Sequence, residues 1–444
     1  MAGSASPQKL SNPYFLLVLL LLAYILSFID RNIMAILVGP IREDFNISDK
    51  YYAWLNGPAF TFLYVILGMP IAWLADRKSR KNIIAQGTAF WSVMTFLCGL
   101  ATGFSSFFMA RMGVGVGEAA LSPPAHSLLA DYFDKRKLPV VMAIFTLGIP
   151  VGVGISYSLG GWVYGVFAEQ GGLVLPLLGS LKPWQLTFML VGLPGLIVAA
   201  LIYQVVEPAR SGLLKVENKA SDDITVVQTL VFLRRHLRVY LSVFLAVSAL
   251  SVLGYSFMMW FVAHASRVYA TPEYAIGKTF GLLYLGCGVL GTVFGAALSG
   301  YMSRRGYQDA GIRVILIIAA LWLLPSIVVT QVPTLQMAYW VSAPCIFCLN
   351  AYFGLSIAAI QVVTPNQMRA QVSSVFLFFT NISGLLVGPV IVGYLSSDWF
   401  SGKQALGHAL SCVACVCCPL AIVLILQALK PYRLLLLQAE NNWL

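Results

Sequence analysis

Four charged residues stand inside long apolar stretches of the chain. Asp30 and Arg31 lie in the first stretch, and Arg111 and Glu118 lie in the fourth. A charge at the centre of a bilayer costs about 2.5–3.5 kcal/mol on translocon scales, so such side chains usually face a cavity and take part in function. Burial raises the affinity of a carboxyl group for a proton, and arginine binds anionic groups. These residue types predict a site for protons and for an anionic part of a substrate.

Their spacing predicts how they pair. Arg111 and Glu118 are seven residues apart, about two helical turns, so they share a helix face. Counting about 1.5 Å per residue from the expected membrane surfaces places Asp30 and Arg111 in the outer half and Glu118 near the middle. We therefore expect an Asp30–Arg111 pair, and we expect Glu118 to be the main proton-coupling carboxylate. The alternative is a fixed network of buried charges that only holds the helices together, in which Arg31 and Arg111 are structural.

The composition indicates the environment of these residues. Hydrophobic residues make up 59% of the 444 residues and charged residues only 10%, whereas soluble domains carry about 25% charge. The net charge of +11 comes from short basic clusters between apolar runs, which is typical of loops at a membrane and not of a nucleic-acid binder. Cys412, Cys415, Cys417 and Cys418 have no His, Asp or Glu among them, so we expect no metal site and no cofactor.

A bilayer core of about 30 Å needs roughly 20 apolar residues per helix. This length predicts twelve transmembrane helices, near residues 14–38, 52–75, 82–103, 106–130, 139–165, 184–206, 238–264, 276–302, 312–330, 335–363, 370–396 and 405–429. A polar stretch after the sixth helix divides them. We expect an N-terminal six-helix bundle (1–206), a cytoplasmic linker with an amphipathic helix (207–237) and a C-terminal six-helix bundle (238–444).

The positive charges predict the orientation. Twenty of the 28 lysines and arginines fall in segments on the side of the N-terminus, and six fall on the opposite side. Because lysine and arginine accumulate in cytoplasmic loops, both termini are expected in the cytoplasm. The localisation is then the cell membrane (the inner membrane in a bacterium), with multiple passes.

An internal repeat is visible as well. Gly148–Gly152 in the fifth predicted helix has a counterpart in Gly384–Gly388 of the eleventh, about half the chain away. The loop at 72–81 likewise corresponds to 300–306. Duplicated halves with a substrate site between them near mid-membrane are common in secondary transporters. We therefore expect an all-α polytopic membrane protein with two pseudo-symmetric six-helix bundles.

Several motifs carry a family resemblance. The loop Ala72–Lys81, with Asp76, Arg77, Arg80 and Lys81, resembles the G-x-x-x-D-R-x-G-R-K signature of the major facilitator superfamily, although Ala72 and Ser79 replace two glycines. Further matches are Arg111–Ala119, Gly148–Gly161, Phe28–Asn32, Ile360–Asn366 and Gly388–Pro389. Together they resemble the spinster branch of that superfamily. The resemblance implies a major facilitator fold and transport of sphingosine-1-phosphate or related lysophospholipids, coupled to an ion gradient.

From these observations we expect a proton-coupled transporter of an amphipathic lipid that works by alternating access. Asp30, Arg31, Arg111 and Glu118 are the candidate substrate-binding residues, and Glu118 and Asp30 are the candidate proton-coupling residues. Asp76, Arg77 and Arg80 are the candidate cytoplasmic gate, because an Asp at a helix end can pair with an arginine and release it on reorientation. The second half offers aromatic rather than charged side chains, which suits an acyl chain.

The main alternative keeps the fold and changes the substrate to a soluble organic anion or a drug. The chain has no complete phosphate-binding G-x-x-x-x-G-K-[ST] loop, since Pro272 stands where the first glycine would precede Gly277–Thr279, and it has no surface cluster of His and acidic residues. We therefore expect neither an ATP-driven pump nor an enzyme. The expected partners are the lipid substrate, protons and the surrounding membrane lipids, and we expect a monomer with no nucleic acid.

Overall fold

The computed structural model describes residues 12–133, 137–176, 179–208, 226–365 and 368–442. The chain folds into two compact units. Unit 1 contains Met1–Phe45 and Pro58–Lys215, and unit 2 contains Asn46–Gly57 and Val216–Leu444. A short segment of the first half of the sequence therefore belongs to the same unit as the second half.

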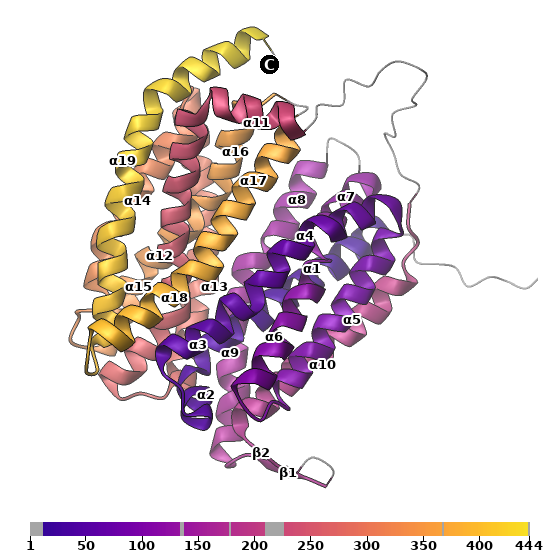
Figure 1. The fold of residues 1–444 in the computed structure, drawn as a ribbon, viewed down its shortest axis with the longest axis vertical. Coiled ribbons are helices and arrows are strands. Elements are labelled where there is room, and N and C mark those ends of the chain that lie inside the picture. Colours follow the sequence, from indigo (N-terminus) through magenta and orange to yellow (C-terminus); the bar gives the residue numbers. More distant parts are fainter. Residues whose placement is uncertain (1–11, 134–136, 177–178, 209–225, 366–367, 443–444) are drawn as a thin grey trace, which may run out of the picture. The chain divides into compact units, whose positions relative to one another are not determined.

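Unit 1 is a bundle of helices with one short hairpin (Figure 1). Its elements are α1 (Pro13–Asn32), the 3₁₀ turn η1 (Ile33–Ile36), α2 (Val38–Phe45), α4 (Pro58–Arg77), α5 (Arg80–Cys98), α6 (Phe104–Glu118), α7 (Ser122–Tyr132), α8 (Leu138–Thr146), α9 (Gly148–Glu169), β1 (Leu173–Leu175), β2 (Gly179–Leu181) and α10 (Pro183–Gln204). The two strands pair antiparallel, with Val174 opposite Ser180.

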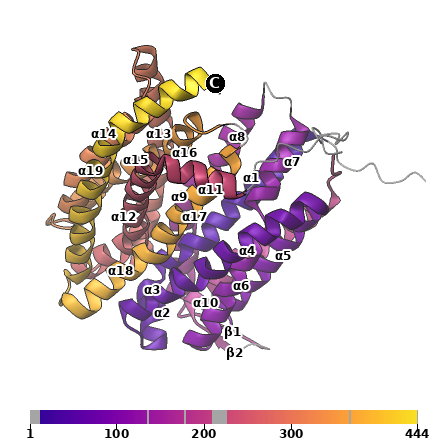
Figure 2. The same cartoon turned by 45° about the horizontal axis from the view of Figure 1, so that its top comes forward.

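Unit 2 holds α3 (Asp49–Asn56) and the remaining helices. These are α11 (Val226–Arg235), α12 (Leu237–Tyr269), α13 (Glu273–Arg304), α14 (Ala310–Val328), α15 (Leu335–Ala351), α16 (Phe353–Val362), α17 (Arg369–Asn381), the π-helical turn η3 (Ile382–Val387), α18 (Gly388–Tyr394), the π-helical turn η4 (Leu395–Trp399) and α19 (Ala405–Asn442). Figure 1 shows α11 and α3 at opposite ends of this unit, and in both views α3 lies beside α18 (Figures 1 and 2).

Helices occupy the positions of all twelve predicted spans. Within the described residues, nine helices are long and apolar enough to cross a membrane. The other three predicted spans correspond to α3–α4, to α5 and to α6–α7. Two of these spans are each divided into two helices, and glycine and proline explain the divisions. Gly57 and Pro58 separate α3 from α4, and α7 has Pro123 in its first turn, where proline begins a helix readily.

The part of the expected linker that the structure describes contains the helix α11, at Val226–Arg235. Residues 209–225 of the expected linker lie outside the described residues. At the end of α11, Arg234 and Arg235 are exposed, and Leu233 packs into unit 2.

Glycines bring the helices of unit 1 close enough to place the charged residues. A Cβ atom on Gly115 of α6 would lie 2.2 Å from the Phe60 carbonyl oxygen of α4. One on Gly117 would lie 2.6 Å from the Trp91 nitrogen of α5. Because only glycine permits such approaches, the glycine-rich sequence of α6 allows Arg111 and Glu118 to be enclosed by neighbouring helices.

Candidate functional site

The four charged residues singled out in the sequence come together in unit 1. Asp30 and Arg31 occupy the last turn of α1, and Arg111 and Glu118 lie on α6. Asp30, Arg111 and Glu118 are almost wholly buried. The Arg31 side chain retains 11% exposure. The Ser156 hydroxyl of α9 helps to fix this end of α1 by donating to the Ile29 carbonyl at 2.9 Å.

Glu118 is the carboxylate that carries the ion pair. Arg31 Nε lies 2.5 Å from Glu118 Oε2, and the Ser27 hydroxyl donates to the same oxygen at 2.9 Å. Glu118 Oε1 is buried without a hydrogen-bond partner. The pair therefore satisfies one side of the carboxylate and leaves the other oxygen able to accept or hold a proton.

Asp30 has different surroundings. The Thr95 hydroxyl of α5 donates to Asp30 Oδ2 at 3.1 Å, and Oδ1 is buried without a partner. Arg111 Nη1 donates to the main-chain oxygen of Asp30 at 3.1 Å and not to its carboxylate. Among the described residues, no arginine or lysine forms an ion pair with the Asp30 side chain. Its carboxylate thus lacks the direct compensation that a buried negative charge requires.

The predicted pairing was therefore wrong in two respects. We expected Arg111 to pair with the carboxylate of Asp30 and Glu118 to be the less compensated group. The structure instead pairs Glu118 with Arg31. The physical reason is helix geometry: Ser27 and Arg31 are four residues apart on α1, so they share the face that meets Glu118. Asp30 is turned toward Thr95 of α5.

An aromatic cage surrounds the Arg31 guanidinium. Its carbon lies 5.0 Å from the ring centre of Phe28, 4.9 Å from that of Phe60 and 4.7 Å from that of Tyr64. Cation–π contacts of this kind stabilise a cation away from bulk water. Sequence reasoning missed the cage, as well as Ser27 and Thr95. Only Ser27 carried a sequence signal, through its helical spacing from Arg31.

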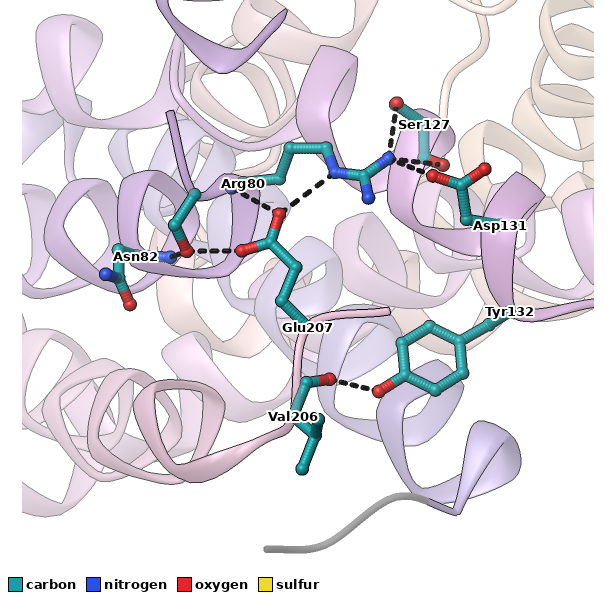
Figure 3. Close-up of polar contacts among 8 residues, drawn as sticks. Arg80, Asn82, Ser127, Asp131, Tyr132, Val206 and Glu207 are labelled. Atoms are coloured by element: carbon teal, nitrogen blue, oxygen red, sulfur yellow. Dashed lines mark hydrogen bonds and ion pairs between the residues drawn. The ribbon is translucent and has the colours of Figure 1, made fainter. Parts of the chain in front are cut away.

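Of the two predicted gate residues whose side chains the structure describes, Arg77 and Arg80, it is Arg80 that has a buried charged environment. Its Nη1 pairs with Asp131 of α7 and donates to the Ser127 carbonyl and hydroxyl at 3.2 and 2.9 Å (Figure 3). Its Nε lies 3.2 Å from Glu207 Oε1. Arg80 thus links α5, α7 and the segment after α10.

Glu207 is the second centre of this cluster. It accepts hydrogen bonds from the Arg80 main-chain nitrogen at 2.9 Å and from the Ser79 hydroxyl (Figure 3). Partial burial raises the pKa of Glu207, but the hydrogen bonds from Ser79 and Arg80 and the Arg80 charge outweigh that effect and lower it. Sequence reasoning missed both Glu207 and Asp131, because each looked like an isolated acidic residue near a helix end.

Arg77 differs from Arg80. Arg77 is exposed, with its guanidinium carbon 3.6 Å from the ring centre of Trp73. Asp76 lies in α4, and its side chain is outside the described part of the structure.

Unit 2 has a comparable acidic centre that the sequence pattern did not reveal. The loop at 300–306 has no Asp at the position expected from the first half. A few residues later, however, Asp309 is buried and lies 2.6 Å from both Arg313 Nε and Arg433 Nε. Burial acts to raise its pKa, but the hydrogen bonds from Arg433 and Arg313 lower it. In the second half, as in the first, a carboxylate therefore links the start of a helix to a segment distant in the sequence: Asp309, just before α14, pairs with Arg433 of α19.

A family model described as the Major Facilitator Superfamily matches residues 20–389. The chain belongs to this superfamily. The expected family and the all-α major facilitator fold are thereby confirmed.

Relatives with different stated roles resemble this superfamily member. It is 29% identical over 388 residues to an MFS-type efflux pump of Mycolicibacterium smegmatis, covering 87% of this chain and 85% of the relative. It is 24% identical to a probable galactarate/D-glucarate transporter of Bacillus subtilis, over 90% and 89% of the two chains. It is 25% identical to protein spinster of Drosophila melanogaster over 67% of this chain and 48% of that protein.

The solved structures add a likeness in fold. A crystal structure of a bacterial homologue of the human lysosomal transporter spinster, described as inward-facing and unoccupied, matches with a TM-score of 0.75 at 23% identity. The match covers 98% of each chain. The resemblance to the spinster branch expected from the motifs is confirmed by these comparisons, and the chain is a multi-pass membrane transporter.

Proposed function

We propose that this transporter is proton-coupled and moves a single-chain amphipathic lipid with an anionic or zwitterionic headgroup, such as sphingosine-1-phosphate or a lysophospholipid. The observation that supports proton coupling is the buried cluster in unit 1. Two carboxylates and two arginines lie together there, and Asp30 Oδ1, Glu118 Oε1 and Arg111 Nε are buried without partners. These atoms supply acceptors for protons and a donor for an anion. The likeness to spinster proteins supports a lipid substrate.

The ion pair suggests how proton and substrate are coupled. Arg31 is held by Glu118 and is more exposed than Arg111. A phosphate or carboxylate headgroup would compete with Glu118 for Arg31. Once released, Glu118 would be a buried carboxylate without a cation and would take up a proton. Substrate binding and protonation of Glu118 are thus linked through one guanidinium.

Asp30 and Glu118 have different roles in the proposed mechanism. Its carboxylate is buried without an ion-pair partner among the described residues, which favours its neutral form in the state seen here. The observed pairing therefore favours Asp30 as the group protonated before substrate binds, and Glu118 as the group protonated on binding. Arg111 holds the Asp30 main chain and offers its free Nε to the headgroup.

The decisive experiment is transport by purified protein in proteoliposomes with an imposed pH gradient. The panel contains sphingosine-1-phosphate, lysophosphatidylcholine, lysophosphatidylglycerol and short-chain analogues with the same headgroups. We expect uptake to follow the pH gradient, to collapse with a protonophore and to require the long chain. Equal transport of headgroup-matched soluble compounds would contradict the lipid assignment.

A second candidate is an antiporter of soluble organic anions or drugs. Two observations favour it: the clustered guanidinium groups of Arg31 and Arg111 suit any anion, and the relatives include an efflux pump and a transporter named for sugar acids. Galactarate and a cationic dye belong in the same proteoliposome panel for this reason. Saturable, gradient-driven movement of either one, with none of the lysolipids, would select this candidate.

We also propose an orientation in the membrane and a cytoplasmic gate, both from the positions of the charged residues. We propose cytoplasmic termini, because most basic residues fall on the side of the N-terminus. We also propose a cell-membrane location and a monomer. On this orientation the cluster of Arg80, Asp131 and Glu207 is cytoplasmic. We propose that it stiffens unit 1 around the loop 76–80, and that Asp76 and Arg77 are the gating residues.

A further inference from the structure

The helix α11 has an outward face that is both aliphatic and basic. Leu233 is buried against unit 2, whereas Leu230 and Val231 are 53% and 61% exposed. Arg234 and Arg235, in the last turn, are exposed as well. With 3.6 residues per turn, these four exposed positions fall on the side of the helix away from Leu233. Aliphatic groups in the middle of α11 and positive charge at its end therefore point outward together.

Aromatic contacts fix α11 against the start of α12. The ring centre of Phe232 lies 5.8 Å from that of Tyr240, and the Tyr240 hydroxyl donates to the Val363 carbonyl at 3.1 Å. His236 alone separates the two helices. Figure 1 shows α11 lying across the end of unit 2, transverse to α12. The outward face of α11 and the first turns of α12 thus meet in a corner, which we call the basic corner (residues 230–238).

An apolar row leads away from this corner along α12. Leu237, Leu241 and Leu245 are 50%, 40% and 40% exposed. Because they are four residues apart, they share one face of the helix. Arg238 is exposed and lies three residues before Leu241, on the same side. Since α12 is long and apolar enough to cross a membrane, this leucine row is suited to contact with acyl chains.

The arginines of the basic corner are not neutralised by the protein. Within the described residues, no acidic side chain pairs with Arg234, Arg235 or Arg238. By contrast, Arg433 in the same unit pairs with Asp309. Clustered basic residues on a helix at a membrane surface attract anionic lipids. Three such charges beside an exposed apolar row match a molecule with a phosphate at one end and a hydrocarbon chain at the other.

We propose that the basic corner binds an anionic phospholipid of the surrounding bilayer, with the phosphate at its three arginines and one acyl chain along the leucine row of α12. The site is made by unit 2 alone and uses none of the buried charges of unit 1. A lipid bound there would anchor α11 in the headgroup layer and fix the start of α12. The proposal does not depend on which substrate is transported.

The test measures binding of one lipid to the purified full-length protein in detergent. Dioleoylphosphatidylglycerol is titrated, and native mass spectrometry gives the apparent Kd of the first lipid retained. Dioleoylphosphatidylcholine, with the same chains and a zwitterionic headgroup, is titrated in parallel. We expect the anionic lipid to bind about tenfold more tightly. Inorganic phosphate at the same concentration should not displace it, because phosphate has no chain to contact the leucine row.

The informative variant combines Arg234→Gln with Arg235→Gln. The matched control combines Arg304→Gln with Arg305→Gln, which removes the same charge from two neighbouring exposed arginines at the end of α13. Because α12 and α13 are successive spans, the start of one and the end of the other lie at the same end of unit 2. We expect the first variant to weaken binding of the anionic lipid about tenfold and the control to change it by less than about twofold. Binding of the zwitterionic lipid should be unchanged in both.

A phosphatidylglycerol with a photoreactive diazirine in one acyl chain then locates the bound lipid. Peptide mass spectrometry should find the cross-link within residues 237–245 of the parent protein and lose it in the Arg234→Gln, Arg235→Gln variant. Cross-links confined to other segments would reject the site.

Three binding results would also overturn the proposal. Equal affinity for the two lipids would show that the arginines do not select the headgroup. Equal loss in the two double variants would reduce the effect to general attraction between lipid and basic loops. Unchanged affinity in the Arg234→Gln, Arg235→Gln variant would assign this face to another occupant, such as a soluble protein.

Discussion

Arg31 Nε and Glu118 Oε2 lie 2.5 Å apart across α1 and α6, while the carboxylate of the adjacent Asp30 bonds to the Thr95 hydroxyl of α5. Two carboxylates in one buried cluster therefore have different electrostatic environments. One has a cation in contact and is favoured as the ion, and the other lacks one and is favoured as the neutral acid. This difference gives the proposed coupling mechanism its order of protonation.

The first prediction concerns the two isosteric substitutions of these carboxylates. Asp30→Asn mimics the neutral group that the structure favours, so it should retain binding of substrate and lose pH-gradient-driven transport. Glu118→Gln removes the carboxylate that holds Arg31, so it should abolish coupling of transport to the pH gradient. It should also tighten binding of an anionic substrate, because the substrate no longer competes with a carboxylate for the Arg31 guanidinium. Counterflow exchange, which needs no net proton movement, separates binding from coupling. We expect counterflow to survive in Asp30→Asn.

Full pH-driven transport by Asp30→Asn would contradict this assignment. The same result for Glu118→Gln would remove Glu118 from the coupling mechanism. If both variants keep full pH dependence, the buried charges serve only to hold α1, α5 and α6 together.

The second prediction tests the aromatic cage of Arg31. Arg31→Lys keeps the positive charge but loses the planar group that stacks against Phe28, Phe60 and Tyr64. We expect the apparent KM for an anionic substrate to rise about tenfold, corresponding to about 1.4 kcal/mol. The pH profile of transport should be unchanged, because both carboxylates remain. A tenfold loss in the maximal rate with an unchanged KM would argue that Arg31 acts in the conformational cycle instead.

Sequence reasoning identified all four buried charges because each one interrupts an apolar helix. It could not pair them, since pairing depends on the rotation of α1 about its own axis, which places Arg31 toward α6 and Asp30 toward α5. Acidic partners such as Glu207 and Asp309 were missed for a related reason. They lie at helix ends, where a charge is common, and only the fold brings Arg80 or Arg433 to them. The placement of α3 in unit 2 likewise depends on contacts between residues more than 200 positions apart.

The third prediction compares the contributions of Arg77 and Arg80 to the stability of the fold. Arg80 is 2% exposed and shared by Asp131 and Glu207, so Arg80→Gln removes the buried cation that both carboxylates contact. Breaking a buried pair in this way costs about 3–5 kcal/mol. We expect a large fall in the thermal midpoint measured in detergent. Arg77→Gln is the control: Arg77 is exposed, so its loss should lower stability by less than about 1 kcal/mol. Similar midpoints for the two variants would contradict the structural role of Arg80.

The fourth prediction is a dependence of stability on pH. Because the pKa of Glu207 is lowered in the folded protein from its ordinary value of 4.5, its ionised form stabilises the fold. That contribution is complete above about pH 4.5 and is lost as the pH falls through the folded-state pKa. The thermal midpoint should therefore fall more steeply below about pH 4.5 in the parent protein than in Glu207→Gln. Asp309, whose pKa is also lowered, titrates equally in both proteins and cancels in the comparison. Parallel curves would show that Glu207 gains no stabilisation from Ser79 and Arg80.

The last prediction concerns the close approach that encloses the charged cluster. Gly115→Ala places a methyl group 2.2 Å from the Phe60 carbonyl oxygen, and because that atom is main chain, α4 and α6 must move apart. Overpacking of this kind costs typically about 1–3 kcal/mol, and the movement should also loosen the contact of Arg31 with Phe60 and Tyr64. Gly68→Ala is the matched control, since it lies in α4 with nothing within 4 Å of the added methyl group. Replacing a helical glycine by alanine there should raise stability by about 0.5–1 kcal/mol. Thermal unfolding in detergent should give shifts of opposite sign for the two variants, and stabilisation by both would mean that α4 and α6 are not in contact at Gly115.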